Sequence, residues 1–514
     1  MAQLEIIPPA ISSRALYFLT AIAIVLPLLL WKARRWADLY HKRQAVKKEN
    51  GCKDPPRYPN KDPIFGLDVA WRNYISWKKS NLLPELSSRY RKCGNTYSLH
   101  LGGSRSLSTI EPENLKSMLS TNFTSYTFGS KRTNALLPFL GASVFTLTGA
   151  DWQHSRAMIR PNLAKDQFVD AEMTTFEKHF GRLLSSLPKD GSEIDLQPLF
   201  FAFTLNTSIE LLTGQDVHLD HEVSQMFDDA EGLIGDQILL SFIPFRRSRR
   251  QYLQACKLCH AWVDRYVHEA IKEHQAQTYT TSVEEGKELG EGKYSLLSEL
   301  VKETHDVPRI RGELIGMLTA GRETTASALS SLWFTLAKRP DIVRKLQAEV
   351  AELDGQKPTF AQLKKMRYLQ NTIQEALRLY PPLPANMRTA VEDAILPVGG
   401  GLDGLSPIFV SKGQLIIYNV YAMHRRQDIY GADAETFRPE RWEETSLRPG
   451  WGYLPFNGGP RICLGQQFAL TEIAYTTVRL LQEFQAVESR DPAQWQEKWQ
   501  INCAVKTGCK VSLF

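Results

Sequence analysis

The feature that most constrains this chain is a short glycine-rich segment near its C-terminal end, residues 456–465, which is FNGGPRICLG. It presents a single cysteine, Cys463, directly before a segment with the pattern of a helix. A thiolate there is stabilised by the positive end of the helix and by the neighbouring Arg461, and a stabilised thiolate is a good metal ligand. The ordinary alternative is a buried structural cysteine, as most single cysteines are.

The same segment matches the pattern F-x-x-G-x-R-x-C-x-G at every fixed position, from Phe456 to Gly465. With average residue usage, a chance match in a chain of 514 residues is on the order of one in ten thousand. The chain therefore resembles the cytochrome P450 family, over essentially everything from residue 60 onward. The resemblance implies that Cys463 is the axial thiolate ligand of a haem b iron, and that Phe456 and Arg461 help to bind the haem.

A second segment of the family pattern lies in residues 308–338, a run without internal proline that predicts one long helix through the centre of the fold. Its middle, residues 320–325, is AGRETT. Taken alone, such a segment is more often a routine piece of helix whose hydroxyls bond to the preceding turn. By resemblance, Thr324 is the hydroxyl that activates dioxygen and Glu323 is the acid beside it. Gly321 and its small neighbours would let the helix approach a flat macrocycle.

Four side chains are candidates for holding the haem propionates. Trp152 and Arg156 match the family's W-x-x-x-R, and guanidinium and indole N–H groups form charge-assisted bonds to carboxylates. Without that context, a tryptophan and an arginine four residues apart are more often a packing pair at the surface. By resemblance, Arg461 in the cysteine segment and Arg388, after a proline-rich turn, are the further partners.

An ion-pair motif with a predicted structural role precedes that turn. Glu375 and Arg378 form the E-x-x-R of the family, and Arg441 in the segment PERW completes it. Ion pairs three residues apart on a helix are commonplace. By resemblance the three residues hold the core on the haem side, so we do not count them as catalytic.

The seven cysteines are an odd number scattered over a long chain, which indicates reduced thiols rather than a disulfide framework. Two of them lie in CKLCH, residues 256–260, which is the attachment motif of c-type haem. The surrounding sequence has the pattern of a helix interior. We therefore interpret this motif as helix packing and predict haem b rather than haem c.

Positive charge gathers at the N-terminus and not on the body of the chain. Residues 1–61 hold eleven Lys and Arg against four Asp and Glu, a net +7. The rest of the chain has 51 against 52, a net −1, within a total of +6. A nucleic-acid-binding protein carries a basic face on its folded domain. No nucleic-acid partner is predicted.

Within that basic stretch, residues 15–31 are uncharged and almost entirely apolar. As a helix they would span roughly 26 Å, close to the bilayer of the endoplasmic reticulum at about 27 Å. The basic cluster behind them places the body in the cytosol. The alternative, a cleaved signal peptide, needs small residues after its apolar core, and WKARRW follows here.

These features predict three segments. Residues 1–31 form a single-pass anchor in the endoplasmic reticulum membrane, residues 32–62 a basic and proline-rich linker, and residues 63–514 one haem-thiolate domain, mainly α with a minor β part. The apolar segment 238–245, which precedes four arginines, either dips into membrane lipid or ends a buried helix.

Four longer strings resemble one subgroup, the fungal membrane-bound hydroxylases of n-alkanes and fatty acids. They are residues 136–161, 375–388, 424–442 and 455–472. The resemblance implies a monooxygenase that hydroxylates a hydrophobic alkyl chain, of an alkane, a fatty acid or a specialised metabolite. It would use O2 and electrons from NADPH delivered by a separate NADPH–cytochrome P450 reductase.

The exact substrate is left open, because Ser143, Val144 and Thr148 depart from the residue types of that subgroup. Two other functions also stay open. One is a haem-thiolate isomerase or dehydratase that does not use O2, against which the intact pair Glu323 and Thr324 argues. The other is a haem-binding protein without enzymatic activity.

Overall fold

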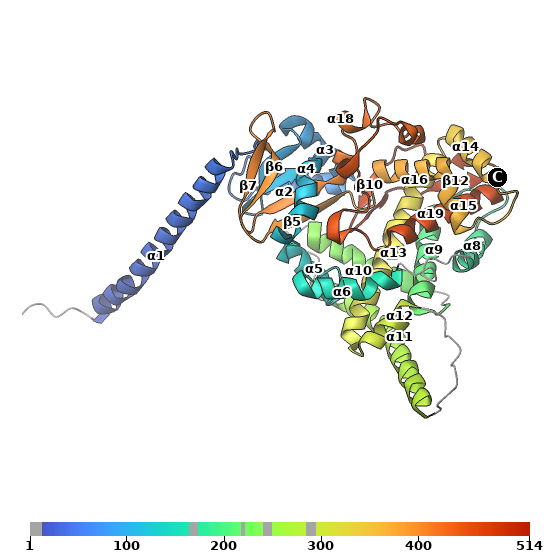
Figure 1. Ribbon diagram of the computed structural model, residues 1–514, viewed down its shortest axis with the longest axis horizontal. Helices are drawn as coiled ribbons and strands as arrows, with labels where there is room; N and C mark the ends of the chain where they lie inside the picture. The colour runs from blue at the N-terminus through green and yellow to red at the C-terminus, as the bar shows by residue number, and fades with distance from the viewer. Residues whose placement is uncertain (1–12, 164–172, 217–220, 240–248, 284–294) are drawn as a thin grey trace, which may run out of the picture.

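Figure 1 shows the computed structural model of the chain, which describes residues 13–163, 173–216, 221–239, 249–283 and 295–514. A helix-rich part makes up most of the molecule, and a smaller sheet-rich part lies beside it. One long helix at the N-terminus projects away from both parts (Figure 1). The mainly α architecture with a minor β part, expected from the sequence, is confirmed.

The long central helix is α13 (Val307–Leu336), as the sequence predicted for residues 308–338. Its start follows from local chemistry, since the Asp306 carboxylate accepts from the backbone N–H of Arg309 and Pro308 occupies the first turn. The other helices in the described residues are α1 (Ser13–Glu49), α2 (Leu67–Lys78), α3 (Leu82–Cys93), α4 (Pro112–Lys116), α5 (Ser130–Leu140), α6 (Gly149–Leu163), α8 (Thr174–Ser185), α9 (Leu196–Thr213), α10 (His221–Leu239), α11 (Arg249–Val283), α12 (Leu296–Glu303), α14 (Pro340–Ala351), α15 (Phe360–Lys365), α16 (Arg367–Leu379), α17 (Val420–Met423), α18 (Gln427–Tyr430) and α19 (Gln466–Glu483).

The main sheet has five strands in the order β1-β2-β8-β5-β3, and only the pair β2 and β8 is parallel. Strands β1 and β2 form an antiparallel hairpin around Gly102 and Gly103. Three smaller sheets pair β6 with β7, β10 with β11, and β12 with both β4 and β9. The strands are β1 (Thr96–Leu101), β2 (Ser104–Thr109), β3 (Tyr126–Thr127), β4 (Ile194–Asp195), β5 (Ala385–Ala390), β6 (Ala394–Gly400), β7 (Ser406–Val410), β8 (Leu415–Asn419), β9 (Val487–Ser489), β10 (Glu497–Trp499), β11 (Cys503–Val505) and β12 (Lys510–Leu513).

Helix α13 is buried along most of its length, and two of its glycines set how closely the chain before α6 approaches it. A Cβ atom at Gly312 would lie 2.6 Å from the carbonyl oxygen of Leu140, and one at Gly316 would lie 2.8 Å from the ring of Phe145. The turn between α5 and α6 is also held by Glu313, whose carboxylate accepts from the backbone N–H of Val144 at 3.0 Å. This turn forms one wall of the site described below.

Residues 360–380 contain no proline and have the pattern of one helix, but the structure divides them into α15 and α16. The break lies at Met366, whose backbone is extended. The carboxylate of Glu349, on α14, accepts from the backbone N–H groups of Tyr368 and Leu369 at 2.9 and 2.8 Å. A side chain from another helix therefore caps α16, which local periodicity could not indicate.

Helix α1 runs without interruption to Glu49, so the first part of the predicted linker, residues 32–62, is helical. Its last part is docked on the sheets, because the backbone N–H of Lys53 donates to Pro407 and that of Tyr58 donates to Ser98. Proline-rich chain can still join a sheet edge through its non-proline residues. Arg43 of α1 also forms a two-pronged ion pair with Asp393, at 2.8 and 2.9 Å.

Within the described part of the chain, none of the helices is both long enough and apolar enough to span a membrane. Residues 1–12 and the side chains of residues 13–24 lie outside that part. The structure thus does not confirm the predicted anchor at residues 15–31, which stays a prediction. The lipid-contacting segment considered at residues 238–245 also lies largely outside the described residues.

Candidate active site

A cavity of about 520 Å³ lies between the middle of α13 and the cysteine segment. Its wall brings together Thr324 and Glu323 of α13 with Phe456, Arg461 and Cys463 of that segment. The sequence places these two groups far apart in the chain, and the fold brings them to one space. The remaining wall is mostly apolar and comes from many elements, among them α2, α5, the turn before α6, α13, β5 and β8.

The cysteine segment is shaped by its own residues. The backbone N–H of Cys463 donates to the carbonyl oxygen of Phe456 at 3.0 Å, which closes the loop. Gly459 has a φ of +68°, and a Cβ atom there would lie 1.8 Å from the carbonyl oxygen of Leu119. Only glycine fits that position. The family pattern thus has a steric cause in this chain.

The thiol of Cys463 faces the cavity. Its surface is accessible, yet protein surrounds it on its other sides. Burial raises its pKa, against the opposing effects of the backbone N–H of Gly465 and the positive charge of Arg156. A bound metal cation reverses such a shift, because a coordinating thiol is held as the thiolate. The position therefore suits a metal-ligating cysteine.

Three arginines gather around the ring of Phe128, at one edge of the cavity. The guanidinium carbons of Arg132, Arg388 and Arg461 lie 3.9, 4.5 and 4.7 Å from the centre of that ring. Burial and the neighbouring arginines lower the pKa of Arg132 to about 10 and that of Arg461 to about 9. Among the described residues, no carboxylate forms an ion pair with any of the three.

These guanidinium groups donate mainly to the backbone. Arg132 donates to Phe145 at 3.0 Å and Arg461 donates to Leu147 at 2.9 Å. Arg388 donates to Met387 at 2.8 Å, and its buried Nη2 has no hydrogen-bond partner. Buried like charges without a counter-ion are costly, so the cluster favours an anionic ligand at this edge.

Trp152 and Arg156 also line the cavity, as the sequence predicted. Trp152 is buried and lies against the guanidinium of Arg461, whose carbon is 4.1 Å from the indole centre. Arg156 donates to the carbonyl oxygen of Ile462 at 3.0 Å and so supports the cysteine segment. Arg388 is the exception, because it lies behind Phe128 and does not line the cavity.

Arg132 is a site residue that sequence reasoning missed. It lies near the start of α5, where the sequence GSKRTN matches no pattern that would mark it. Only the fold brings it to the other arginines. A haem carries an iron and two carboxylates, and the cavity offers a thiol and a cationic edge. The residues present fit such a group.

The hydroxyl of Thr324 lines the cavity and donates to the carbonyl oxygen of Ala320 at 2.7 Å, the ordinary bond of a helical threonine. The carboxylate of Glu323 accepts from its neighbour Arg322 at 2.8 Å. Gly321 also serves packing against α9, since a Cβ atom there would lie 2.7 Å from the hydroxyl oxygen of Ser208. The acid is thus engaged in an ion pair, which the sequence did not indicate.

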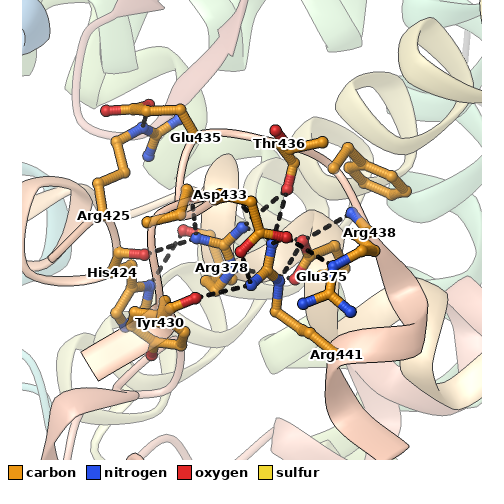
Figure 2. Close-up of polar contacts among 12 residues, drawn as sticks. Glu375, Arg378, His424, Arg425, Tyr430, Asp433, Glu435, Thr436, Arg438 and Arg441 are labelled. Carbon is orange, nitrogen blue, oxygen red and sulfur yellow. Dashed lines mark hydrogen bonds and ion pairs between the residues drawn. The ribbon is translucent and has the colours of Figure 1, made fainter. Parts of the chain in front are cut away.

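The E-x-x-R motif, predicted to be structural, forms a buried cluster with Arg441. Figure 2 shows Glu375 between Arg378 and Arg441, all fully buried. Arg378 donates to both carboxylate oxygens of Glu375 at 2.9 and 2.8 Å, and Arg441 donates to one of them at 2.9 Å. His424 links this cluster to the cysteine segment, because its ring bonds to the carbonyl of Arg378 and accepts from the backbone N–H of Leu454.

The CKLCH motif lies within α11, away from the cavity wall. Cys256 and Cys259 are buried, and burial raises the pKa of Cys256 to about 11. His260 donates to the carbonyl oxygen of Phe139 at 2.8 Å. The motif is part of helix packing, as predicted. All seven cysteines are unpaired in the structure.

Comparison with known proteins agrees with this geometry. A family model described as Cytochrome P450 matches residues 56–507. The chain is 42% identical to the cytochrome P450 monooxygenase himC of Aspergillus japonicus, over 96% of this chain and 88% of that protein. It is 39% identical to the cytochrome P450 monooxygenase fsdH of Fusarium heterosporum, over 98% and 89%. It is 40% identical to cytochrome P450 52A5 of Candida maltosa, over 84% and 85%.

Proposed function

Because the chain belongs to the cytochrome P450 family and is a monooxygenase, we propose that its substrate is a molecule with a long apolar alkyl chain, which it hydroxylates. The candidates are n-alkanes, fatty acids and alkylated specialised metabolites. The family implies haem, O2 and electrons from a reductase; we propose NADPH as their source.

The observation that carries this proposal is the apolar wall of the cavity. Phe139, Val144, Phe145, Met317 and Ile501 are among the side chains that line it. The wall continues as far as Trp77 on α2. Such a space excludes water and offers a hydrocarbon chain contact along its length. A polar substrate would leave its groups without partners there.

In this proposal, Cys463 would supply a thiolate ligand to the iron. Arg132, Arg461 and Arg156, with Trp152, would hold the propionates by charge-assisted bonds. When bound, the haem supplies the activation of dioxygen for insertion into a C–H bond. Phe456 closes the loop that positions the thiolate, through its carbonyl oxygen.

Thr324 and Glu323 manage protons in this proposal. The hydroxyl of Thr324 faces the cavity, so it can give up its bond to Ala320 and donate toward a bound ligand instead. Glu323 stands next to it in the chain and can restore the proton. Their placement favours a monooxygenase over an isomerase or dehydratase, because the latter reactions need no delivery of protons to bound dioxygen.

We also propose that the enzyme is anchored in the endoplasmic reticulum membrane by residues 1–31, with its body in the cytosol, and draws its substrate from lipid. Helix α2 supports this, because it lines the cavity and carries exposed apolar side chains at its start. Leu67 is 56% exposed and Trp71 is 61% exposed, beside Ile64 and Phe65. Protease protection in microsomes tests the topology, and a protected body would contradict it.

The substrate proposal is tested by binding difference spectra with n-alkanes, fatty acids and alkylated polyketides, followed by product analysis with reductase and NADPH. We expect a spectral shift with long chains and a hydroxylated product. Cys463→Ala should lose both the thiolate-type carbon monoxide band and turnover. Turnover without NADPH and O2 would favour the isomerase or dehydratase. A Cys463→Ala protein with full activity would overturn the proposal.

A further inference from the structure

A second cavity, of about 1180 Å³, lies on the other side of α13. It is lined by α9, α10, α11 and the β10–β11 connection, with many polar side chains. Exposed residues such as Asp229 and Gln254 are part of its wall, so it communicates with solvent. Glu323, Gln500 and Asn502 line both cavities and form the partition between them.

Behind this partition lies a cluster of charged groups from α10 and α13. The buried guanidinium of Arg322 donates to Glu323 at 2.8 Å and to Asp228 at 2.5 Å. Its Nη1 lies 3.8 Å from Glu231, whose side chain is only 5% exposed. Two buried polar atoms here have no hydrogen-bond partner, Oε1 of Glu231 and Nε of Arg322. The carboxyl groups of Glu231 and Glu323 lie close enough to share a hydrogen bond.

The charges of this cluster do not balance if every group is ionised. Three carboxyl groups face one guanidinium, and only Asp228 is substantially exposed, at 45% of its side chain. From α11 the thiol of Cys259 faces Glu231, and from α9 the ring of Phe201 covers Arg322. Among the described residues, the one other cation of the cavity wall is Lys498, exposed on β10. A second buried carboxylate would lack a counter-charge, so one proton stays on the pair.

The direction of both pKa shifts agrees with this count. Burial and the negative charge of Glu323 raise the pKa of Glu231 well above its usual range. Burial also raises the pKa of Glu323, although Arg322 opposes that effect. Glu231 is therefore the group that holds the proton, and Glu323, bonded directly to Arg322, is the group that can receive it.

From this geometry we propose that Glu231 relays protons from water in the second cavity to Glu323. Glu231 gives its proton to the carboxylate of Glu323, which passes it on toward Thr324, and Glu231 then takes a proton from cavity water. Each cycle moves one proton inward and leaves the cluster charge unchanged. The inference rests on the proposed roles of Glu323 and Thr324, and it gives Glu231 a positioning and relay role without contact to substrate.

A direct test uses infrared spectroscopy of the resting enzyme, which needs no substrate. The spectrum should contain the carbonyl bands of buried protonated carboxyls, and Glu231→Gln should remove one band, distinct from the band that Glu472→Gln removes. Asp229→Asn is the matched control, because it removes a negative charge from the same helix and cavity wall but is exposed. If the carboxyl bands of Glu231→Gln are the same as those of the wild type, the proposal is overturned.

A kinetic test uses the alkane or fatty acid with the largest binding spectral shift. In Glu231→Gln we expect kcat to fall about tenfold with KM unchanged and the solvent isotope effect to rise. The wild-type kcat should fall as pH rises through the pKa of the pair, because the relay then loses its proton, and the variant should lack that limb. Glu231→Asp should restore part of kcat.

Three further variants separate failure of the relay from failure of the proposed function. If Thr324→Ala and Glu323→Gln lower kcat while Glu231→Gln does not, the relay is wrong and the proposed function stands. If none of the three lowers kcat, the proposed role of Thr324 and Glu323 fails. Asp228→Asn also removes a partner of Arg322, so a purely structural role of Glu231 predicts the same kinetics for Asp228→Asn and Glu231→Gln, which would contradict the relay.

Discussion

The molecule contains two buried clusters of arginine and glutamate, around Glu375 and around Glu323, and they differ in how completely their polar atoms are paired. In the cluster of Glu375, Arg378 makes five hydrogen bonds, two to that carboxylate and three to backbone carbonyls (Figure 2). A guanidinium has five donors, so none is left over. In the cluster of Glu323, the Nε of Arg322 and an oxygen of Glu231 have no partner.

The difference separates a structural network from one that can change state. A fully bonded buried network is rigid and favours a single conformation, whereas unpaired buried polar atoms are costly and are retained where function uses them. Glu375 ties the end of α16 to the segment around Arg441, which supports the cysteine segment. Glu323 and Glu231 instead lie between two cavities, where a proton can move.

The largest expected effect is on the fully bonded cluster. Glu375→Gln leaves the guanidinium groups of Arg378 and Arg441 buried without their shared carboxylate. We expect the free energy of unfolding to fall by about 3–5 kcal/mol, as measured by urea denaturation. Glu323→Gln serves as the comparison, and its loss should be smaller, because Arg322 keeps Asp228. Equal losses in the two variants would remove the distinction between the clusters.

Glu472, a buried carboxyl outside both clusters, shows how stability depends on pH when no cation pairs with the carboxyl. Glu472 on α19 accepts from the hydroxyl of Thr207, its Oε2 has no partner, and burial raises its pKa to about 8. The folded state binds this proton more tightly than the unfolded state. Stability from this group is therefore full below about pH 4.5 and is lost as pH rises to about 8, by roughly 1.4 kcal/mol per unit. Between pH 5 and 7, Glu472→Gln should lack this decline in urea denaturation. A parallel decline in both proteins would contradict the assignment.

For His424, which is bonded to the cluster of Glu375, we expect the free energy of unfolding to depend on pH with the opposite sign. Burial lowers its pKa to about 3, so its ring is neutral when folded and donates to the carbonyl of Arg378. The stability that it contributes is present above about pH 6.5 and is lost as pH falls, by roughly 1.4 kcal/mol per unit. Between pH 6.5 and 5, His424→Gln should be less stable than wild type but flatter with pH. His268→Gln, at an exposed site, is the control and should keep the wild-type slope.

The part of the site that the sequence predicted depends on local constraints. Gly459 and Cys463 belong to a segment whose shape is set by its own backbone, so a pattern search finds it. Thr324 was placed correctly on the cavity wall because one helix of regular geometry carries it. The bonded cluster of Glu375 was predicted as structural for the same reason, since its first pair is a single helical turn.

The rest depends on contacts between elements distant in the chain. The helix break at Met366 is caused by Glu349 from another helix. The charged cluster around Arg322 depends on α10, which supplies Asp228 and Glu231. Arg132 has no signal in its own segment. In each case the partner comes from tertiary packing, and residue spacing alone carries no information on it.

The smallest expected effect concerns the arginines around Phe128, a cluster whose charges are all positive. Arg132→Gln removes one of three repelling cations, so the protein without haem should gain stability, by about 1 kcal/mol. The same change removes a donor for a propionate, so haem should dissociate faster, by about tenfold. Denaturation of the haem-free protein and transfer of haem to apomyoglobin measure the two effects. Lys131→Gln removes a charge from the adjacent position and is the control. The two expected effects have opposite signs. If Arg132→Gln instead lowers the stability of the haem-free protein, the contacts of Arg132 within the fold already stabilise it, and its position is not explained by binding of an anion.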